Sequence, residues 1–442
     1  MQRTTMYDYH DAVHHKLIII GAGASGLMAA VTARDLGIDT AILEGNDRIG
    51  KKIAMTGDGR CNITNESTRA GTDDEGVALS RKYYGSQSGF PLPVLQQFGI
   101  QQTIDFFHVL GLPLTRLKEG LMYPMSLQAA SVVDIFELAL EERNIPVYLN
   151  NKVMDVTVST NQPRFTITCR TDTGEQTVYT SEYLFLCTGG LTGQNAGTDG
   201  SGYTLAERMG HTLIKPLPAI VQLKVKYPYQ KGLSGIKLQG QAHLLVNGKI
   251  VRSEAGEIHF TDYGFSGPPI LQLGRKAAVH LAKRDDVTLS IDLMPNRTED
   301  EVIEFLETNW GLFAHRTVAE SFIGFLHKKL VTVLLKEAKI DQESGLLCQD
   351  LSWKTKKIFY KLLKSWEFKV TETHSFEHAQ ATAGGIATKE LDPGTLESKL
   401  VPGLYLAGEV MDVDGDFGGY NLQWAWSSGY TAAMALGKHI FR

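Results

Sequence analysis

The chain is 442 residues long and 43% hydrophobic, which allows a large buried core and excludes a small disulfide-stapled module. Its 44 basic and 49 acidic residues give a formal net charge of -5, and this near balance excludes a general electrostatic attraction to nucleic acid or anionic membranes. The cysteines (Cys61, Cys169, Cys187 and Cys348) form no C-x-x-C pair, so no disulfide framework or structural zinc site is expected, and this usage fits a cytoplasmic protein.

The most apolar stretch is Leu17–Ala33, close to the N-terminus. Glycines interrupt it and it is short for a bilayer, so we expect no membrane span. Acidic rather than basic residues precede it, so we predict no targeting segment. Residues 1–15 are expected to form a polar leader with solvated histidines at His10, His14 and His15.

A βαβ unit comes first. The hydrophobic pattern predicts a strand over Lys16–Ile20, a helix over Ser25–Leu36 and a strand over Thr40–Leu43. In the intervening G-x-G-x-x-G, Gly21 permits a tight turn, Gly23 lets a pyrophosphate approach the backbone, and Gly26 lets helix and sheet pack closely. Glu44, at the end of the second strand, can accept bonds from ribose hydroxyls. Together these features predict a dinucleotide site.

A basic, glycine-rich segment follows over Gly50–Asn62, with the sequence G-K-K-I-A-M-T-G-D-G-R-C-N. It closely resembles the family of bacterial flavoproteins that includes the BaiN-type bile-acid reductases and the aminoacetone oxidases. The resemblance implies an FAD cofactor, with Arg48 and Lys51 close to its pyrophosphate. It also implies that the isoalloxazine is lined by Gly57, Arg60, Cys61 and Asn62.

Cys61 allows two interpretations. Arg60 beside it would favour a thiolate, and thus a redox role. No resolving cysteine is evident, however, and a free cysteine usually behaves as a small buried hydrophobe. We therefore favour a packed cysteine beside the flavin.

The next stretch mixes helices and strands. Its patterns predict helices over Pro91–Leu110 and Ser131–Arg143, and strands over Val147–Leu149, Lys152–Val158, Phe165–Cys169 and Tyr183–Cys187. The last strand runs into Thr188-Gly189-Gly190, and Gly197–Gly202 opens a helix that ends near Met209. This pair loosely resembles fumarate-reductase-type flavoproteins, which usually have T-G-D-G here. In this chain Asp199 comes one residue early, so the role of that acid is open.

From about residue 214 the pattern becomes β-rich. Apolar and polar residues alternate over Gln222–Lys226 and Gln241–Val246, which indicates strands, and Asn247-Gly248 predicts a tight hairpin. The family-like segment Phe260–Pro269 is either a Gly/Pro turn or a substrate-facing loop. Helices are then predicted over Glu301–Trp310, Thr317–Lys336 and Thr355–Trp366, before strand and loop signals return at Val370–Thr382.

The C-terminus carries a second cofactor signal. A strand over Gly403–Leu406 leads to A-G-E at Glu409, where FAD-specific Rossmann proteins have A-G-D with an acid that meets ribityl or phosphate oxygens. Asp412 is a second candidate for that role. Gly418-Gly419 precede a predicted helix over Asn421–Leu436. The N-terminal dipole of this helix would stabilise an anionic reduced flavin.

These segments predict an α/β fold with a discontinuous Rossmann-type FAD-binding domain. We assign it residues 1–213 and 380–442, a β-barrel-like substrate domain residues 214–295 and 367–379, and a small helical cap residues 296–366. By resemblance, the active site lies where the insert meets the flavin. Gly384-Gly385, at the return of the chain, is either a further approach to the flavin or a plain turn.

The candidate cofactor residues lie at strand ends, in the basic segment and at the start of the last helix, with Val153 on a nearby strand. They are Gly21, Gly23, Ala24, Ser25, Gly26, Glu44, Arg48, Lys51, Gly57, Arg60, Cys61, Asn62, Val153, Thr188, Gly189, Gly190, Gly408, Glu409, Asp412, Gly419, Tyr420, Asn421 and Leu422. No catalytic acid or base is identified, and Arg60 is the candidate catalytic cation. His374 and His378 lack a third ligand, so no metal site is expected.

The resemblance implies an FAD-dependent oxidoreductase that moves hydride between a non-covalently bound flavin and a small organic substrate. We favour reduction of an activated C=C bond, with NAD(P)H as transient reductant and no separate nicotinamide domain. The alternatives are a flavin-dependent amine oxidase that uses O2 and a non-catalytic redox sensor. No nucleic-acid or membrane partner is expected, and the basic amphipathic segment Lys354–Trp366 is interpreted as a solvated face.

Overall fold

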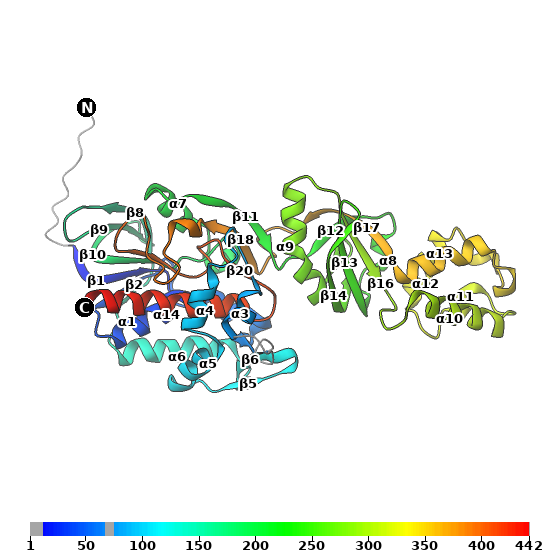
Figure 1. Ribbon diagram of the computed structural model, residues 1–442, viewed down its shortest axis with the longest axis horizontal. Helices are drawn as coiled ribbons and strands as arrows, with labels where there is room; N and C mark the ends of the chain where they lie inside the picture. Colours follow the sequence, from blue (N-terminus) through cyan, green and yellow to red (C-terminus); the bar gives the residue numbers. More distant parts are fainter. Residues whose placement is uncertain (1–11, 67–74, 442) are drawn as a thin grey trace, which may run out of the picture. The chain divides into compact units, whose positions relative to one another are not determined.

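The computed structural model describes residues 12–66 and 75–441, and the chain divides into two compact units (Figure 1). The first unit consists of Met1–Pro216 and Ala381–Arg442, and the second is the insert Leu217–Gln380. Most of the predicted leader lies outside the described residues. Its last part is wrong, because His14 and His15 belong to a strand, where the His14 ring is bonded to Thr180 Oγ1 at 3.1 Å.

A central sheet organises the first unit. Its strands are β1 (Val13–Ile20), β2 (Thr40–Leu43), β7 (Val147–Tyr148), β8 (Asn151–Val158), β9 (Phe165–Thr171), β10 (Gln176–Leu186) and β19 (Leu404–Leu406). The order is β7-β2-β1-β10-β9-β8, with β19 also beside β10. β7, β2, β1, β10 and β19 pair in parallel, whereas β9 and β8 continue the sheet antiparallel. The carboxyl half of β1 is fully buried, as a strand covered on both faces must be.

Helix α1 (Ala24–Asp35) and the last helix, α14 (Tyr420–Ile440), lie side by side, blue and red in Figure 1. Gly429 makes this possible, because a Cβ there would lie 2.3 Å from the Ser25 carbonyl oxygen. One turn earlier in α14, Trp426 packs its ring 5.1 Å from Phe107 and 5.8 Å from Phe136, centroid to centroid. The C-terminal helix is therefore part of the central core.

Smaller elements surround this core. They are α2 (Lys51–Met55), α3 (Glu75–Ser80), α4 (Pro91–Gln97), α5 (Ile100–Val109), α6 (Ala129–Glu142), α7 (Ser201–Arg208), β3 (Thr64–Asn65), β4 (Tyr83–Tyr84), β5 (Leu114–Arg116), β6 (Leu121–Pro124), β11 (Leu213–Ala219), β18 (Ala381–Ile386) and β20 (Asp414–Gly415). The single helix predicted over Pro91–Leu110 is wrong. Phe98 has φ -142° and ψ 89°, which ends α4, and Gly99 caps α5.

The second unit contains a closed barrel in the order β12-β15-β14-β13-β16-β17. Its strands are β12 (Leu223–Lys226), β13 (Lys237–Val246), β14 (Lys249–Phe260), β15 (Gly264–Ser266), β16 (Val287–Asp292) and β17 (Trp366–Thr373), with helices α8 (Gln230–Leu233) and α9 (Pro268–Ala282). The predicted Asn247-Gly248 hairpin is confirmed, since both residues have positive φ (49° and 78°), as a type I′ turn requires. Phe260, Phe265 and Phe368 fill the barrel interior.

Helices α10 (Glu299–Leu312), α11 (Val318–Ser321), α12 (Lys328–Glu337) and α13 (Trp353–Lys364) complete the second unit. The helix predicted over Thr317–Lys336 is two helices, because His327 is extended and caps α12 with its ring. The predicted end at Trp366 is also wrong, since that residue begins β17. The α/β fold class, with a Rossmann-type part and a barrel-containing insert, is confirmed. Within the described residues, every helix is too short or too polar to span a bilayer.

We expect Gly429→Ala to lower the free energy of unfolding by about 1–3 kcal/mol, because the added methyl group collides with the backbone of α1. Gly437→Ala is the matched control on the same helix, since its Cβ would meet only the movable tip of Leu36, at 2.7 Å. Thermal unfolding should show a clear loss for the first variant and a change within about 0.5 kcal/mol for the second. Equal losses would contradict this account of the packing.

Candidate functional site

Parallel pairing gathers four loops at one edge of the sheet in the first unit. Ile20 of β1 stands beside Leu43 of β2 and Leu186 of β10. Leu186 in turn stands beside Leu406 of β19. All four residues end their strands, so the loops that follow lie next to one another. These loops begin at Gly21, Glu44, Cys187 and Ala407, and each contains predicted cofactor residues.

The glycines of the first loop have different surroundings. A Cβ on Gly21 would lie 2.6 Å from the Cys187 carbonyl oxygen, and a Cβ on Gly26 would lie 1.9 Å from the Gly21 carbonyl oxygen. These two glycines are required by packing. Gly23 has no atom within 4 Å of its Cβ position, and it caps α1, whose first turn has neither a side-chain cap nor an acidic residue. Its open face and free helix N–H groups suit a phosphate.

Glu44 connects this loop to the next one. Its side chain is buried, with Oε2 accepting from Ala22 N at 2.8 Å and Oε1 accepting from Asn46 N and Asn46 Nδ2 at 2.8 and 2.7 Å. A charged acceptor makes such bonds stronger than neutral ones. The carboxylate therefore fixes both loops at the position where a ribose is predicted.

The cations of the basic segment differ in their partners. Lys51 Nζ lies 2.6 Å from Asp47 Oδ1, and Lys52 Nζ lies 2.5 Å from Glu409 Oε2. Arg60 is exposed and has no carboxylate within ion-pair distance among the residues described. Arg48, which precedes the segment, is also exposed. Arg60 is therefore the cation of Gly50–Asn62 whose charge is left available to a ligand.

The loop that carries Arg60 has an unusual backbone. Gly57, Asp58 and Cys61 have φ of 58°, 53° and 59°. Left-handed conformations at residues other than glycine cost of order 1–3 kcal/mol each and gather at functional sites. Cys61 is completely buried, and burial raises the pKa of its thiol to about 12. A neutral thiol at physiological pH supports the packed interpretation of this cysteine over the redox one.

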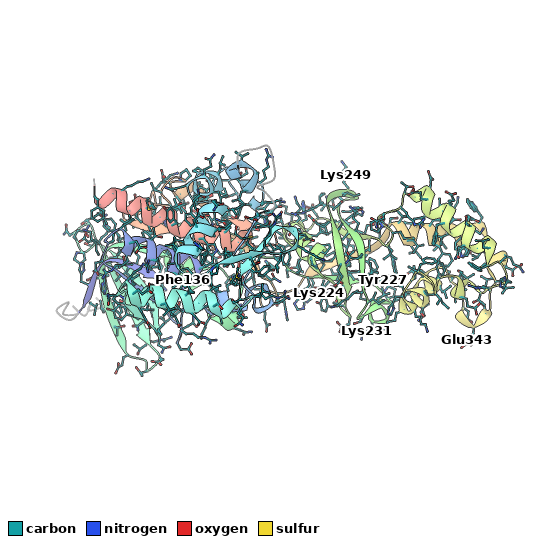
Figure 2. All side chains as sticks on the ribbon, turned by 90° about the horizontal axis from the view of Figure 1, so that it is seen from below. Phe136, Lys224, Tyr227, Lys231, Lys249 and Glu343 are labelled. Carbon is teal, nitrogen blue, oxygen red and sulfur yellow. The ribbon has the colours of Figure 1, made fainter. Side chains whose placement is uncertain are left out.

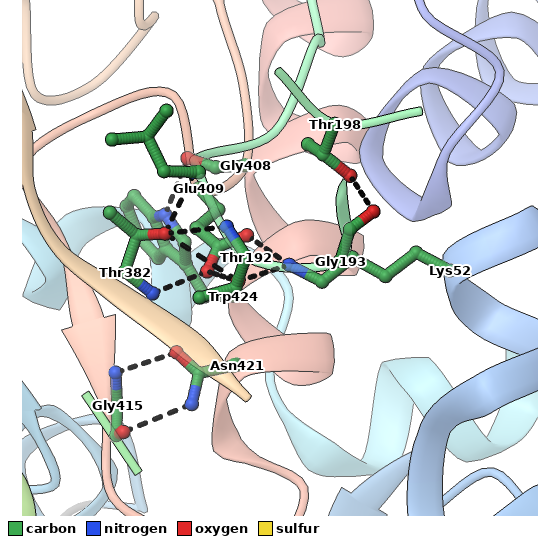
Figure 3. Close-up of polar contacts among 11 residues, drawn as sticks. Lys52, Thr192, Gly193, Thr198, Thr382, Gly408, Glu409, Gly415, Asn421 and Trp424 are labelled. Carbon is green, nitrogen blue, oxygen red and sulfur yellow. Dashed lines mark hydrogen bonds and ion pairs between the residues drawn. The ribbon is translucent and has the colours of Figure 1, made fainter. Parts of the chain in front are cut away.

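Glu409 is the centre of a polar network, shown in Figure 3. One carboxylate oxygen accepts from Lys52 Nζ, and the other accepts from Thr382 N at 2.7 Å and from Thr192 Oγ1 at 3.3 Å. Thr382 Oγ1 in turn accepts from Leu191 N at 2.9 Å. The predicted flavin acid is thus held by the chain itself, and its bonds join β18 to the loop after β10.

Sequence reasoning did not assign Lys52, Thr192 or Thr382 a place in the site. The available signal is their position, because Thr192 follows Gly190 by two residues and Thr382 precedes Gly384 by two. A Cβ on Gly190 would lie 2.5 Å from Thr382 Oγ1 and 3.2 Å from the Glu409 carboxyl carbon. This glycine allows the network to close.

The C-terminal loop brings the start of α14 to the same part of the unit. Its cap, Gly419, has φ 95° and lies against Thr64 and Asn62, and the first turn of the helix contains no acidic residue. Asn421 is held by two bonds to the backbone of Gly415, at 2.8 and 2.9 Å (Figure 3). The first turn of α14 therefore adds no negative charge of its own to the N-terminal end of the helix dipole.

The remaining C-terminal candidates have internal partners. The Asp412 carboxylate accepts from Ser86 N at 2.7 Å. Tyr420 packs edge to face against Tyr83, and Leu422 is partly buried against the core. None of these contacts identifies a ligand.

Three buried polar atoms without partners lie in or next to the loops that carry the predicted cofactor residues. Asn62 Oδ1, Thr188 Oγ1 and Tyr203 OH are buried and have no hydrogen-bond partner. Burial, and secondarily Glu409 and Asp412, raises the pKa of Tyr203. Each such atom costs about 1–3 kcal/mol unless something bonds to it. A dinucleotide supplies hydroxyl, phosphate and ring heteroatoms, so the residues fit FAD.

Further candidates have contacts within the chain. Val153 is buried within β8 and pairs with Cys169, and Asn151 N, at the start of the same strand, donates to the Glu44 carbonyl oxygen at 2.8 Å. Asp199 bonds to Lys152 Nζ at 2.9 Å and is an ion-pair partner. Gly384 and Gly385 pack against the backbone at Lys215 and Val410, which supports a structural turn.

The motifs of the second unit have structural explanations. In the segment Phe260–Pro269, a Cβ on Gly264 would lie 2.1 Å from the Leu223 carbonyl oxygen, so the glycine serves strand pairing. The rings of His374 and His378 lie 3.9 Å apart. Within the described part of the chain, no group of three His, Cys, Asp or Glu residues could hold a metal ion.

Comparison with known proteins shows which family the chain matches. The family model described as HI0933-like protein Rossmann domain matches residues 15–435. A 3-dehydro-bile acid delta(4,6)-reductase from Clostridium scindens is 37% identical over 96% of this chain and 99% of its own length. A ribosomal RNA dihydrouridine synthase from Haemophilus influenzae is 28% identical over 95% of this chain and 98% of its own length.

A solved structure shares the fold. The open conformation of a flavocytochrome c3 fumarate reductase has a TM-score of 0.52 and 15% identity, over 98% of this chain and 80% of that one. At this identity the likeness concerns fold alone.

We expect Glu44→Gln to weaken FAD binding about 10-fold or more, because the carboxylate makes charge-assisted bonds of about 1.5–3 kcal/mol each. Asp47→Asn is the matched control, since Asp47 is an exposed carboxylate three residues away that pairs with Lys51. Equilibrium dialysis followed by flavin fluorescence of the released FAD measures both. Unchanged affinity in Glu44→Gln, or equal loss in both variants, would remove Glu44 from the cofactor site.

Proposed function

The chain belongs to the HI0933-like Rossmann-domain family, whose members are FAD-dependent oxidoreductases, and from this premise we propose that it reduces a C=C bond conjugated to a carbonyl group. The full-length similarity to the bile acid delta(4,6)-reductase carries this proposal. The name of this relative describes the reduction of double bonds in a bile acid with an oxo group at position 3. Dihydrouridine synthesis adds two hydrogens to a pyrimidine double bond that is also conjugated to a carbonyl. Both names thus describe one kind of substrate bond.

The reaction needs a hydride, a proton and an electrostatic partner. Bound FAD would supply the hydride to the carbon β to the carbonyl, with NAD(P)H as the reductant that restores the cofactor. The α carbon takes a proton, and negative charge develops on the carbonyl oxygen. A fixed cation stabilises that charge most effectively in a site with little water. Arg60 is our candidate, because it is the unpaired cation of the basic segment and lies in its strained loop.

The other charged groups of the site are Lys52, Glu409 and the N-terminal end of the α14 dipole. Glu409 neutralises Lys52, and the N-terminus of α14 carries no acid. The helix dipole then favours negative charge on a reduced cofactor placed before Gly419. In this proposal the site residues hold and tune the cofactor, and Arg60 acts on the substrate.

Two classes of substrate satisfy the same bond requirement. We favour a small organic enone, because the relative at 37% identity carries that activity over its whole length. A uridine in ribosomal RNA is the second candidate, since relatives at 28% identity from Haemophilus influenzae and Escherichia coli carry that name. The amine oxidase and redox sensor alternatives rest on no relative named here.

Anaerobic stopped-flow spectroscopy tests the reaction class. The flavin is reduced with NADH, NADPH or dithionite and then mixed separately with O2, with a panel of enones and with uridine-containing RNA. We expect rapid flavin reoxidation by a conjugated C=C substrate and slow reoxidation by O2. Reoxidation by O2 at about 10 per second or faster, with no response to any enone or RNA, would establish an oxidase instead.

The same experiment tests Arg60. We expect Arg60→Gln to slow the C=C reoxidation step about 100-fold while FAD content stays unchanged. Arg170→Gln is the matched control, since Arg170 is an exposed arginine on β9 and does not belong to the basic segment Gly50–Asn62. Equal rates for Arg60→Gln and the native protein would exclude Arg60 as the electrostatic partner.

A further inference from the structure

Helix α13 presents a basic stripe that the proposed hydride chemistry does not use. Trp353, Lys354, Lys357 and Lys361 recur at three- and four-residue spacing, and all four are exposed, Trp353 by 60%. Lys357 Nζ lies 5.3 Å from the centroid of the Trp353 ring. The helix therefore presents an aromatic face next to three cations.

The charge of this stripe is not neutralised within the unit. Two other lysines of α13 are paired, Lys356 with Glu307 and Lys364 with Asp292, each at 2.6 Å. Lys354, Lys357 and Lys361 have no carboxylate within ion-pair distance among the described residues. The paired lysines bind α13 to neighbouring elements of the unit, whereas the three unpaired lysines are exposed.

The stripe borders a cleft of about 530 Å³. Lys357 and Lys361 lie on its lining beside Tyr227, together with the carboxylates Glu337 and Glu367. Glu337 accepts from the Tyr227 hydroxyl at 2.6 Å, so the ring is fixed in place. Figure 2 places Tyr227 between the barrel strands and the helices of this unit. The exposed Trp353 ring next to lysines is the combination that holds bases and phosphates together.

The two units also differ in charge. Leu217–Gln380 contains 22 Lys and Arg against 19 Asp and Glu, whereas the rest of the chain contains 22 against 30. The near neutrality of the whole chain therefore conceals a basic insert. A separated positive surface attracts a polyanion even when the total charge is negative.

We propose that the α13 stripe and its cleft form a binding site for a single-stranded polynucleotide, with Lys354, Lys357 and Lys361 on the phosphates and Trp353 stacked on a base. A lipid surface fits less well. An interfacial helix inserts its apolar face, but Phe359, Leu362 and Leu363 of α13 are buried in the core of the unit. The proposal gives the segment Lys354–Trp366 a binding role in place of the solvated face expected from the sequence, and it departs from the expectation of no nucleic-acid partner.

The test measures equilibrium binding of the flavin-loaded protein, without turnover, so failure of the proposed reductase activity would not affect it. Fluorescence anisotropy uses labelled oligouridine RNA and oligothymidine DNA of equal length over a series of salt concentrations. The combined variant Lys354→Gln, Lys357→Gln, Lys361→Gln removes the stripe. The matched control, Lys237→Gln, Lys249→Gln, Lys283→Gln, removes exposed lysines elsewhere in the unit; Lys249 is at the start of β14, as labelled in Figure 2.

We expect the stripe variant to bind at least 10-fold more weakly and its slope of log K against log salt to fall by about 2, which corresponds to three lost phosphate contacts. Trp353→Ala should weaken binding about 10-fold with little change in slope, because it removes stacking and no charge. The control should match the native protein. Preference between the RNA and DNA probes identifies which polynucleotide the site takes.

Three results would overturn the proposal. These are a native protein that binds neither probe, a control that loses as much affinity as the stripe variant, and phosphatidylglycerol vesicles that bind through the same lysines while neither polynucleotide does. Circular dichroism and FAD content of each variant separate loss of the site from loss of the fold.

Discussion

The parallel pairing of β1, β2, β10 and β19 is the constraint on which the first unit depends. Parallel strands end at the same edge, so residues that follow Ile20, Leu43, Leu186 and Leu406 become neighbours across nearly the whole length of the chain. The same pairing explains why the unit must be discontinuous, since β19 comes after the insert yet completes the edge. α14 then returns over α1, and the close contact at Gly429 locks the C-terminal segment to the glycine turn.

Local signals in the sequence predicted the elements whose geometry depends on a few adjacent residues. The glycine turn after β1, the strand Thr40–Leu43 and the Asn247-Gly248 hairpin are of this kind, because each needs a particular backbone conformation that few residues allow. Helix ends were harder to predict. The apolar spacing continues through Phe98 and His327, and only the backbone at those residues shows the breaks. The network of Glu409, Lys52, Thr192 and Thr382 joins four segments that are distant in sequence, so the local pattern predicts Glu409 but not its partners.

Ion pairs within the chain determine which Lys and Arg side chains are available to bind a ligand. Glycines and cations alternate over Gly50–Asn62, and the resemblance places Lys51 near the pyrophosphate and Arg60 along the isoalloxazine, but the sequence does not show which cations are paired within the chain. In the structure Lys51 forms an ion pair with Asp47, and Lys52 forms one with Glu409. Among the described residues, Arg60 has no such partner. The same reasoning applies to α13. Two of its lysines form ion pairs with Glu307 and Asp292, and the three lysines of the stripe have no such partner among the described residues. In both places the unpaired cations, rather than the number of basic residues, point to an anionic ligand.

The cofactor is also part of the energetics of the first unit. Asn62 Oδ1, Thr188 Oγ1 and Tyr203 OH are buried without partners, and each costs about 1–3 kcal/mol in that state. Positive φ at Asp58 and Cys61 adds strain beside them. A ligand that bonds to these atoms recovers this free energy only in the folded chain, so binding and folding are linked. A site built in this way holds its cofactor tightly, because losing the ligand leaves the buried atoms unsatisfied.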